Sequence, residues 1–198
     1  MTDSRIFYRR AYAFAFFLFG IFYRFEITGG ENIPRGAAMV CANHSDWLDP
    51  IFLEFAFGKD DRAHIIGKVE LFRIPGLSWL IRKLGMIAVD RGAADISAMR
   101  QSLQYLKNGE KVAIFPEGHR VPENETADAG SGAIWLADRA GAPVLPMYIQ
   151  RRKRVFSKIR LVIGSPYTVG GEGRRLNAGD RAALSAQLMD KITALKPL

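Results

Sequence analysis

The chain has 198 residues, 48% of them apolar, which excludes a disordered chain and allows one domain with a substantial core. Its single cysteine excludes a disulfide framework and a cysteine-rich metal site. The net charge of +8 indicates an anionic partner, which can be a phosphorylated small molecule, a nucleic acid or acidic lipid headgroups.

An uncharged, phenylalanine-rich segment lies near the start of the chain, at residues 11–23 between Arg10 and Arg24. It is shorter than the roughly 20 apolar residues that a membrane-spanning helix needs, and no small-residue signal cleavage site follows it. An amphipathic helix at the membrane interface is favoured, with packing on the core and a true span as alternatives. We therefore assign residues 1–30 to a membrane-associating helix and residues 31–198 to the main domain.

Strands and helices alternate along the rest of the chain. Short apolar runs predict strands at 37–42, 64–68, 86–89, 111–115, 143–149 and 159–164. Helices are predicted at 46–58, 75–85, 93–109, 131–141 and 180–195. This alternation predicts an α/β fold with a mostly parallel central sheet flanked by helices, in which sites gather where strands end and helices begin.

Three local details accompany these elements. Asp46 is predicted to be the N-cap of helix 46–58. Pro143 and Pro146 disfavour a central place for strand 143–149 and fit better at a strand start and a bulge. The apolar face of helix 93–109 comprises Ile96, Met99, Leu103 and Leu106.

The stretch NHSDWLDP, residues 43–50, follows the first of these strands and contains His44 and Asp49. Residues five apart on a continuous helix lie ~140° apart around its axis and do not meet. Because His44 precedes the predicted helix, a turn can bring its imidazole to the carboxylate, which would fix the tautomer and leave the second nitrogen to accept a proton from an alcohol. A loop histidine without a catalytic role stays open, since this spacing also arises by chance.

The stretch FPEGHR, residues 115–120, ends another predicted strand. Gly118 lets a ligand approach the backbone closely, Arg120 can bind phosphate through its forked donors, and Glu117 can anchor that arginine. A strand-end turn with a surface ion pair is the alternative interpretation.

Arg91 ends a strand in the same way, and the carboxyl ends of parallel strands share one edge of the sheet. Arg91 and Arg120 are therefore expected beside His44, as a phosphate-binding rim next to a base. The basic run 151–154, RRKR, is interpreted as a solvated loop that can also touch acidic lipid.

Four stretches in this order resemble the sequence blocks of the glycerolipid acyltransferase family: NHSDWLD, GKVELFRIPGLSWLIRKLGMIAVDR at 67–91, FPEGHR, and APVLPMYI at 142–149. Together they cover roughly residues 40–150. The resemblance implies an α/β domain held on the cytoplasmic face of the cell membrane by its N-terminal helix. It also implies acyl transfer from acyl-CoA or acyl carrier protein to the free hydroxyl of 1-acyl-sn-glycerol-3-phosphate, without a cofactor or metal.

Carried over position by position, the resemblance makes His44 the general base and Asp49 the residue that orients it. It assigns binding of the substrate phosphate to Lys68, Arg91, Glu117, Gly118 and Arg120. Two positions depart from the family pattern: Asp46 stands where serine is more usual, and His119 where threonine or serine is. Both can alter which headgroup is accepted.

The expected partners are therefore a lysophospholipid, an acyl thioester, an anionic membrane surface and, as one candidate donor, acyl carrier protein. Other acceptors stay open: glycerol-3-phosphate, a different lysophospholipid or an amino-acid lysolipid. A non-catalytic module that binds anionic lipid is a further alternative. A nucleic acid is not expected, because the basic residues are not interleaved with exposed aromatic residues along a groove, and the excess of aromatic residues lies in the N-terminal segment.

Overall fold

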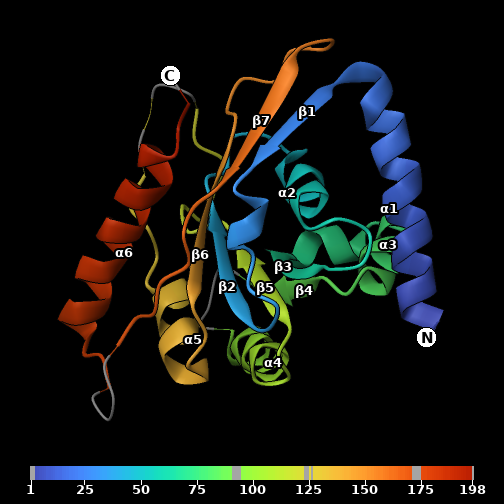
Figure 1. Ribbon diagram of the computed structural model, residues 1–198. Coiled ribbons are helices and arrows are strands. Elements are labelled where there is room, and N and C mark those ends of the chain that lie inside the picture. Colours follow the sequence, from blue (N-terminus) through green and yellow to red (C-terminus); the bar gives the residue numbers. More distant parts are fainter. Residues whose placement is uncertain (1–2, 91–94, 123–124, 126, 171–174, 198) are drawn as a thin grey trace.

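Figure 1 shows the computed structural model of the protein, in which a twisted sheet carries helices on both faces. The structure describes residues 3–90, 95–122, 125, 127–170 and 175–197. The strands are β1 Arg24–Thr28, β2 Ala38–Ala42, β3 Ala63–Lys68, β4 Ile87–Val89, β5 Lys111–Ile114, β6 Val144–Ile149 and β7 Lys158–Ile163. The α-helices are α1 Asp3–Phe22, α2 Asp49–Phe57, α3 Leu77–Lys83, α4 Ile96–Lys107, α5 Gly132–Ala140 and α6 Ala178–Ala194, and 3-10 helices occupy η1 Gly30–Asn32 and η2 Val69–Arg73.

The sheet order is β1-β7-β6-β2-β5-β3-β4. Strands β2 to β6 are mutually parallel, whereas β7 is antiparallel to β6 and β1 is parallel to β7. The predicted α/β fold with a mostly parallel, helix-flanked sheet is therefore confirmed. Strand β1 was not predicted, because its side chains are mostly exposed and the RFEIT sequence carries little apolar signal.

Alternating side chains of the central strands divide the core into two layers. In β2, Val40 packs with the phenylalanines of α2 on one face, whereas Met39 packs on the other face with residues of α4, α5 and α6. Both sides of β2 are fully buried, which explains its continuous apolar sequence. The central strands are thereby covered on both faces, whereas most side chains of β1, at one edge of the sheet, are exposed.

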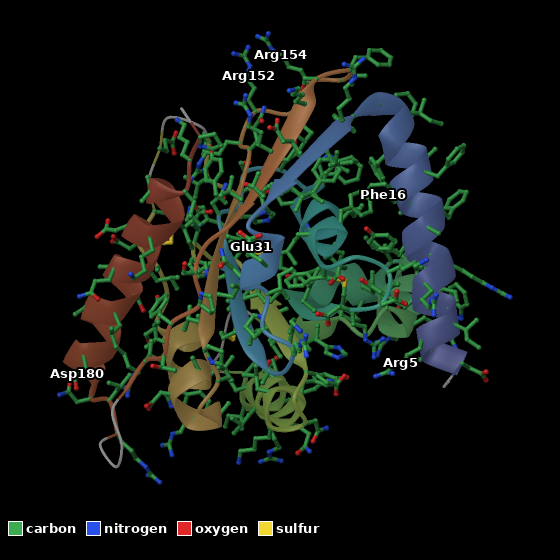
Figure 2. All side chains as sticks on the ribbon, viewed as in Figure 1. Arg5, Phe16, Glu31, Arg152, Arg154 and Asp180 are labelled. Atoms are coloured by element: carbon green, nitrogen blue, oxygen red, sulfur yellow. The ribbon has the colours of Figure 1, made fainter. Side chains whose placement is uncertain are left out.

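Helix α1 lies along the face that α2 and α3 occupy (Figure 1). The Tyr8 hydroxyl oxygen lies within hydrogen-bond distance of the Glu54 carboxyl, at 2.7 Å, and of the Asp61 carbonyl, at 2.9 Å. Figure 2 shows Phe16 directed from α1 toward α2, where its ring meets Phe55 edge-on at 5.2 Å. One side of α1 therefore packs on the core. In the described part of the chain, no helix combines the length and the apolar character needed to cross a membrane.

The other local predictions have mixed outcomes. Helix α2 begins at Asp49, so Asp46 is not the N-cap of this helix. The Asp46 side chain instead accepts a hydrogen bond from the Leu48 amide, within the turn that precedes α2. Ile96 lies at the exposed start of α4, not on its packed face. Strand β6 is central, and Pro146 lies beside a bulge. Tyr148 pairs with Val162, and Val144 pairs with Tyr167, so the segment opposite β6 contains one extra residue between these two pairs.

Candidate active site

The connections that leave β2 and β5, which are parallel neighbours, run to opposite faces of the sheet. The chain leaves β2 into α2 on one face of the sheet, and leaves β5 toward α5 on the other face. Neighbouring strands with diverging connections leave a crevice at their carboxyl ends, where sheets of this kind bind ligands. His44 follows β2 and Glu117 follows β5, so both lie at this crevice.

Asn43 determines where the chain leaves the sheet. Its side-chain amide donates to the Ile149 carbonyl at 2.8 Å, and its side-chain oxygen accepts from the Ile149 amide at 2.8 Å. The side chain thus continues the pairing of β2 with β6 by one residue. His44 comes next, and its carbonyl accepts from the Val121 amide at 2.8 Å. The backbone of His44 is therefore held from both sides, an arrangement that the sequence motif alone did not reveal.

The imidazole of His44 contacts the carboxylate of Asp49, with Nδ1 3.0 Å from Oδ2. The amides of Ser45 and Asp46 donate to the same oxygen at 2.6 and 2.7 Å. The turn that precedes α2 folds the chain back, so two side chains five positions apart meet outside a helix. The predicted contact between His44 and Asp49 is confirmed.

The Asp49 carboxyl is fully buried. Burial raises its pKa, but the hydrogen bond with His44 and the ion pair with Lys153 outweigh burial and hold the pKa below its usual range. Because an ionised carboxylate only accepts hydrogen bonds, Nδ1 of His44 carries the hydrogen and Nε2 is left as a proton acceptor. The imidazole also stacks on Phe115, with centroids 4.3 Å apart, which restricts its rotation.

Glu117 supports the backbone of His44. Its Oε2 accepts a hydrogen bond from the His44 amide, and its Oε1 lies 2.8 Å from Nη2 of Arg151. Arg151 also donates to the Val121 carbonyl at 2.7 Å. The predicted anchoring of Arg120 by Glu117 is therefore wrong, because both carboxylate oxygens are engaged by other groups inside the protein while Arg120 is exposed.

Lys153 reaches the second oxygen of Asp49, with Nζ 2.6 Å from Oδ1. Nζ also donates to the Gln150 carbonyl at 2.9 Å and to Oγ of Ser45 at 3.2 Å. The lysine side chain is 2% exposed and that of Asp49 is 0% exposed. Asp49 therefore lies between two cation-forming side chains, one on each carboxylate oxygen.

The interpretation of run 151–154 as a solvated loop is wrong for two of its four residues. Arg151 and Lys153 turn inward to Glu117 and Asp49, as their ion pairs show. Figure 2 shows Arg152 and Arg154 pointing away from the protein at the end of the sheet. An alternation of inward and outward residues is typical of extended backbone, and here it continues beyond the end of β6.

The residues predicted to bind phosphate lie at neighbouring strand ends. Lys68 is the last residue of β3 and is about half exposed. Gly118, with a φ of 71°, and the exposed Arg120 follow β5, which is the parallel neighbour of β3. Lys68 and Arg120 thus share the sheet edge with the imidazole. Arg91 lies outside the described residues.

A family model described as Acyltransferase matches residues 24–150. The chain belongs to the acyltransferase family. It is 30% identical over 186 residues to the 1-acyl-sn-glycerol-3-phosphate acyltransferase of Pseudomonas aeruginosa, covering 88% of this chain and 71% of that one. It is 32% identical over 147 residues to the Bacillus subtilis protein of that name, covering 71% of this chain and 72% of that one.

A solved structure agrees with this assignment. The acyltransferase is similar to the crystal structure of the 1-acyl-sn-glycerophosphate (LPA) acyltransferase PlsC from Thermotoga maritima, with a TM-score of 0.67 and 27% identity. The likeness covers 99% of this chain and 79% of that chain. The acyltransferase is therefore an enzyme whose sheet and flanking helices match a known member of its family.

Proposed function

We propose that this acyltransferase moves an acyl group from a thioester, on coenzyme A or acyl carrier protein, to the free hydroxyl of 1-acyl-sn-glycerol-3-phosphate, giving phosphatidic acid. The observation that carries the proposal is the contact between His44 and Asp49, which leaves Nε2 as a base at the crevice. The names of the relatives support the choice of acceptor. The reaction belongs to phospholipid synthesis.

In the proposed mechanism, Nε2 of His44 removes the proton of the acceptor hydroxyl, and Asp49 stabilises the imidazolium that forms. The resulting oxygen attacks the thioester carbonyl carbon. The tetrahedral intermediate then collapses, the carbon–sulfur bond breaks, and the thiolate takes the proton back from His44. One ester forms and one thiol is released, so the histidine ends as it began. A base of this kind contributes about 10²- to 10⁴-fold to the rate.

Direct transfer is supported by the state of the two side chains that could otherwise carry the acyl group. The Ser45 hydroxyl donates to the Arg151 carbonyl at 3.2 Å and accepts from Lys153. Cys41 is completely buried inside β2, and burial raises the pKa of its thiol. A serine turned to other partners and a protonated thiol are both poor nucleophiles.

The substrate phosphate would bind at the strand ends beside the base. In this proposal Lys68, Arg91 and Arg120 supply positive charge, and Gly118 allows close approach to the backbone. Glu117 stays part of the proposed site, but its contacts with His44 and Arg151 suit it to hold the base in place. A buried carboxylate would repel a phosphate, whereas it stabilises an arginine and an amide.

Membrane association is proposed through the outer side of α1. Phe14 and Phe17 are 69% and 71% exposed on this helix, and Ile21 is also exposed. Such a helix, with basic residues at one end, suits the interface of an anionic membrane, from which a lysolipid acceptor would arrive.

The test is an acceptor panel with one radiolabelled acyl thioester and purified enzyme. Labelled phosphatidic acid and equimolar free thiol are expected with 1-acyl-sn-glycerol-3-phosphate. Faster turnover of glycerol-3-phosphate or of a headgroup-bearing lysolipid would contradict the acceptor but keep the reaction. Absence of thiol release with every acceptor, on both coenzyme A and carrier-protein donors, would refute the proposed reaction.

A further inference from the structure

We propose that Lys153 is a positioning residue for the catalytic pair, acting through Asp49. This proposal rests on the proposed function, because it assumes that His44 is the base. Lys153 lies in the segment that joins β6 to β7, and its Nζ is 2.6 Å from Oδ1 of Asp49. Asp49 contacts the imidazole of His44 directly, whereas Lys153 contacts the other carboxylate oxygen of Asp49. The effect of Lys153 on the imidazole is therefore indirect.

The two carboxylate oxygens of Asp49 contact different groups. Oδ2 receives His44 and two backbone amides, whereas Oδ1 faces Lys153. The Gln150 carbonyl and the Ser45 hydroxyl hold the ammonium of Lys153 in turn. The carboxylate therefore cannot rotate without losing a partner on one side, and the plane in which it receives Nδ1 is set by the lysine.

The charge of Lys153 also bears on the protonation of the base. A lone buried carboxylate beside an imidazole favours the imidazolium, which cannot act as a base at the start of the reaction. A cation on the other oxygen offsets part of that negative charge. Lys153 thereby fixes the orientation of Asp49 and offsets part of the charge that the carboxylate presents to the imidazole.

The substitution Lys153→Met tests this proposal, because it removes the charge and keeps the length of the side chain. We expect kcat to fall about 10- to 100-fold, as for a small misplacement of a catalytic group. The acidic limb of the kcat/KM profile should move to higher pH, because the carboxylate beside the imidazole loses its neighbouring cation. The KM for the acceptor should change little. Lys158→Met is the matched control, since Lys158 is exposed and pairs only with Glu26 at the surface.

A double-variant comparison separates positioning from general stability. In the Asp49→Asn background, Lys153→Met should lower kcat no further and should restore some stability, because neither buried charge is then left alone. An equal loss of kcat in both backgrounds would show that Lys153 acts elsewhere. A wild-type kcat and an unmoved pH profile for Lys153→Met would overturn the proposal. Failure of the proposed function would instead show as an active His44→Ala enzyme.

A second inference concerns the outward side of the same segment, which we call the tip and define as Arg152, Arg154, Val155 and Phe156. We infer that the tip is a second membrane contact that binds an anionic bilayer. Phe156 is 75% exposed and has a φ of 65°, a backbone conformation that few residues other than glycine adopt. A large apolar side chain held outward in this conformation is unusual for a solvent-exposed turn.

The position and charge of the tip indicate that it binds a lipid surface. The Phe156 amide donates to the Phe22 carbonyl at 2.6 Å, and the two rings lie 6.3 Å apart, so the tip continues the exposed apolar side of α1. Residues 150–157 include no acidic residue, and Arg152 and Arg154 are exposed, whereas the other two basic residues pair with buried carboxylates. Arg152 and Arg154 point outward (Figure 2) and lie close in sequence to the exposed Phe156, a combination that matches an anionic headgroup layer over an apolar interior.

Vesicle binding by the full chain tests this inference without any substrate. Phe156→Asn keeps a residue that tolerates the positive φ, and it should weaken binding to vesicles containing roughly 30% phosphatidylglycerol about tenfold. Arg152→Gln with Arg154→Gln should weaken binding to these vesicles by about fivefold per arginine, and binding to neutral vesicles much less. Ile96→Asn, in the exposed start of α4 at the far end of the molecule, is the control.

Unchanged vesicle binding by both tip variants would overturn the membrane assignment and leave a protein partner as the occupant. Equal weakening by Ile96→Asn would also overturn it, since the effect would then not be local. Because binding is measured without acyl transfer, loss of the proposed reaction would not affect this outcome.

Discussion

The substitution Asp49→Asn removes the charge from the centre of the site without changing its volume. One oxygen of Asp49 receives three donors, and the other faces the ammonium of Lys153. An amide has only one oxygen. In either orientation its NH2 group therefore faces a donor, either the imidazole and the amides or the lysine.

Two magnitudes follow for Asp49→Asn. Leaving Lys153 as an unpaired buried charge should lower the free energy of unfolding by about 3–5 kcal/mol. Loss of the correct tautomer of His44 should lower kcat by about 10³- to 10⁴-fold. As long as the variant remains mostly folded, the fall in kcat is much larger than any fall in rate caused by unfolding. The loss of stability and the loss of kcat can therefore be measured separately.

The assay is thiol release from an acyl thioester under saturating acceptor, combined with urea unfolding of the same preparation. Asp60→Asn serves as the control, because its ion pair with Arg9 is largely exposed and surface pairs are worth little. A folded Asp49→Asn enzyme that retains more than about a tenth of wild-type kcat would refute the role of Asp49 as the orienting residue.

Three further predictions concern the rim, α1 and the buried Glu54 of α2. Arg120→Ala should raise the KM for phosphate-bearing acceptors about tenfold with little change in kcat, as initial rates over an acceptor series can show; an unchanged KM contradicts the phosphate role. Phe14→Ser with Phe17→Ser should reduce co-sedimentation with anionic vesicles severalfold, and full binding contradicts docking through α1. Burial raises the pKa of Glu54 to about 8 from an ordinary value of 4.5, so stability from the neutral carboxyl is complete below about pH 4.5 and is lost as pH rises through about 8. Urea unfolding across this range should show a smaller loss for Glu54→Gln, and equal losses contradict the assignment.

The contact between His44 and Asp49 could be predicted because its geometry is local. His44 and Asp49 are five positions apart at a strand-to-helix junction, so a single turn determines whether they meet. The alternation of strands and helices likewise predicted the parallel sheet. Strand β1 escaped prediction because its pairing with β7, rather than any apolar pattern of its own, makes it a strand.

The groups that support the pair could not be predicted from the motif, because their partners are distant in sequence. Glu117 lies 73 positions from His44, and Lys153 lies 108 positions from Ser45. In sequence, Lys153 is one of four consecutive basic residues, and nothing in the run distinguishes an inward side chain from an outward one. The position at which β6 ends determines which residues of the run point inward. The sheet order places β6 beside β2, so the inward residues reach the site.

The two hydrogen bonds between the Asn43 side chain and the Ile149 backbone affect the order in which parts of the protein fold during synthesis. These two residues are 106 positions apart, so the site cannot take shape until the chain has emerged beyond β6. Helix α1, by contrast, precedes all the strands in the chain, and an α-helix depends largely on local hydrogen bonds. A nascent chain can therefore expose the apolar side chains of α1 well before Asn43 is paired and His44 is held at the sheet, which happens only after β6 has been added.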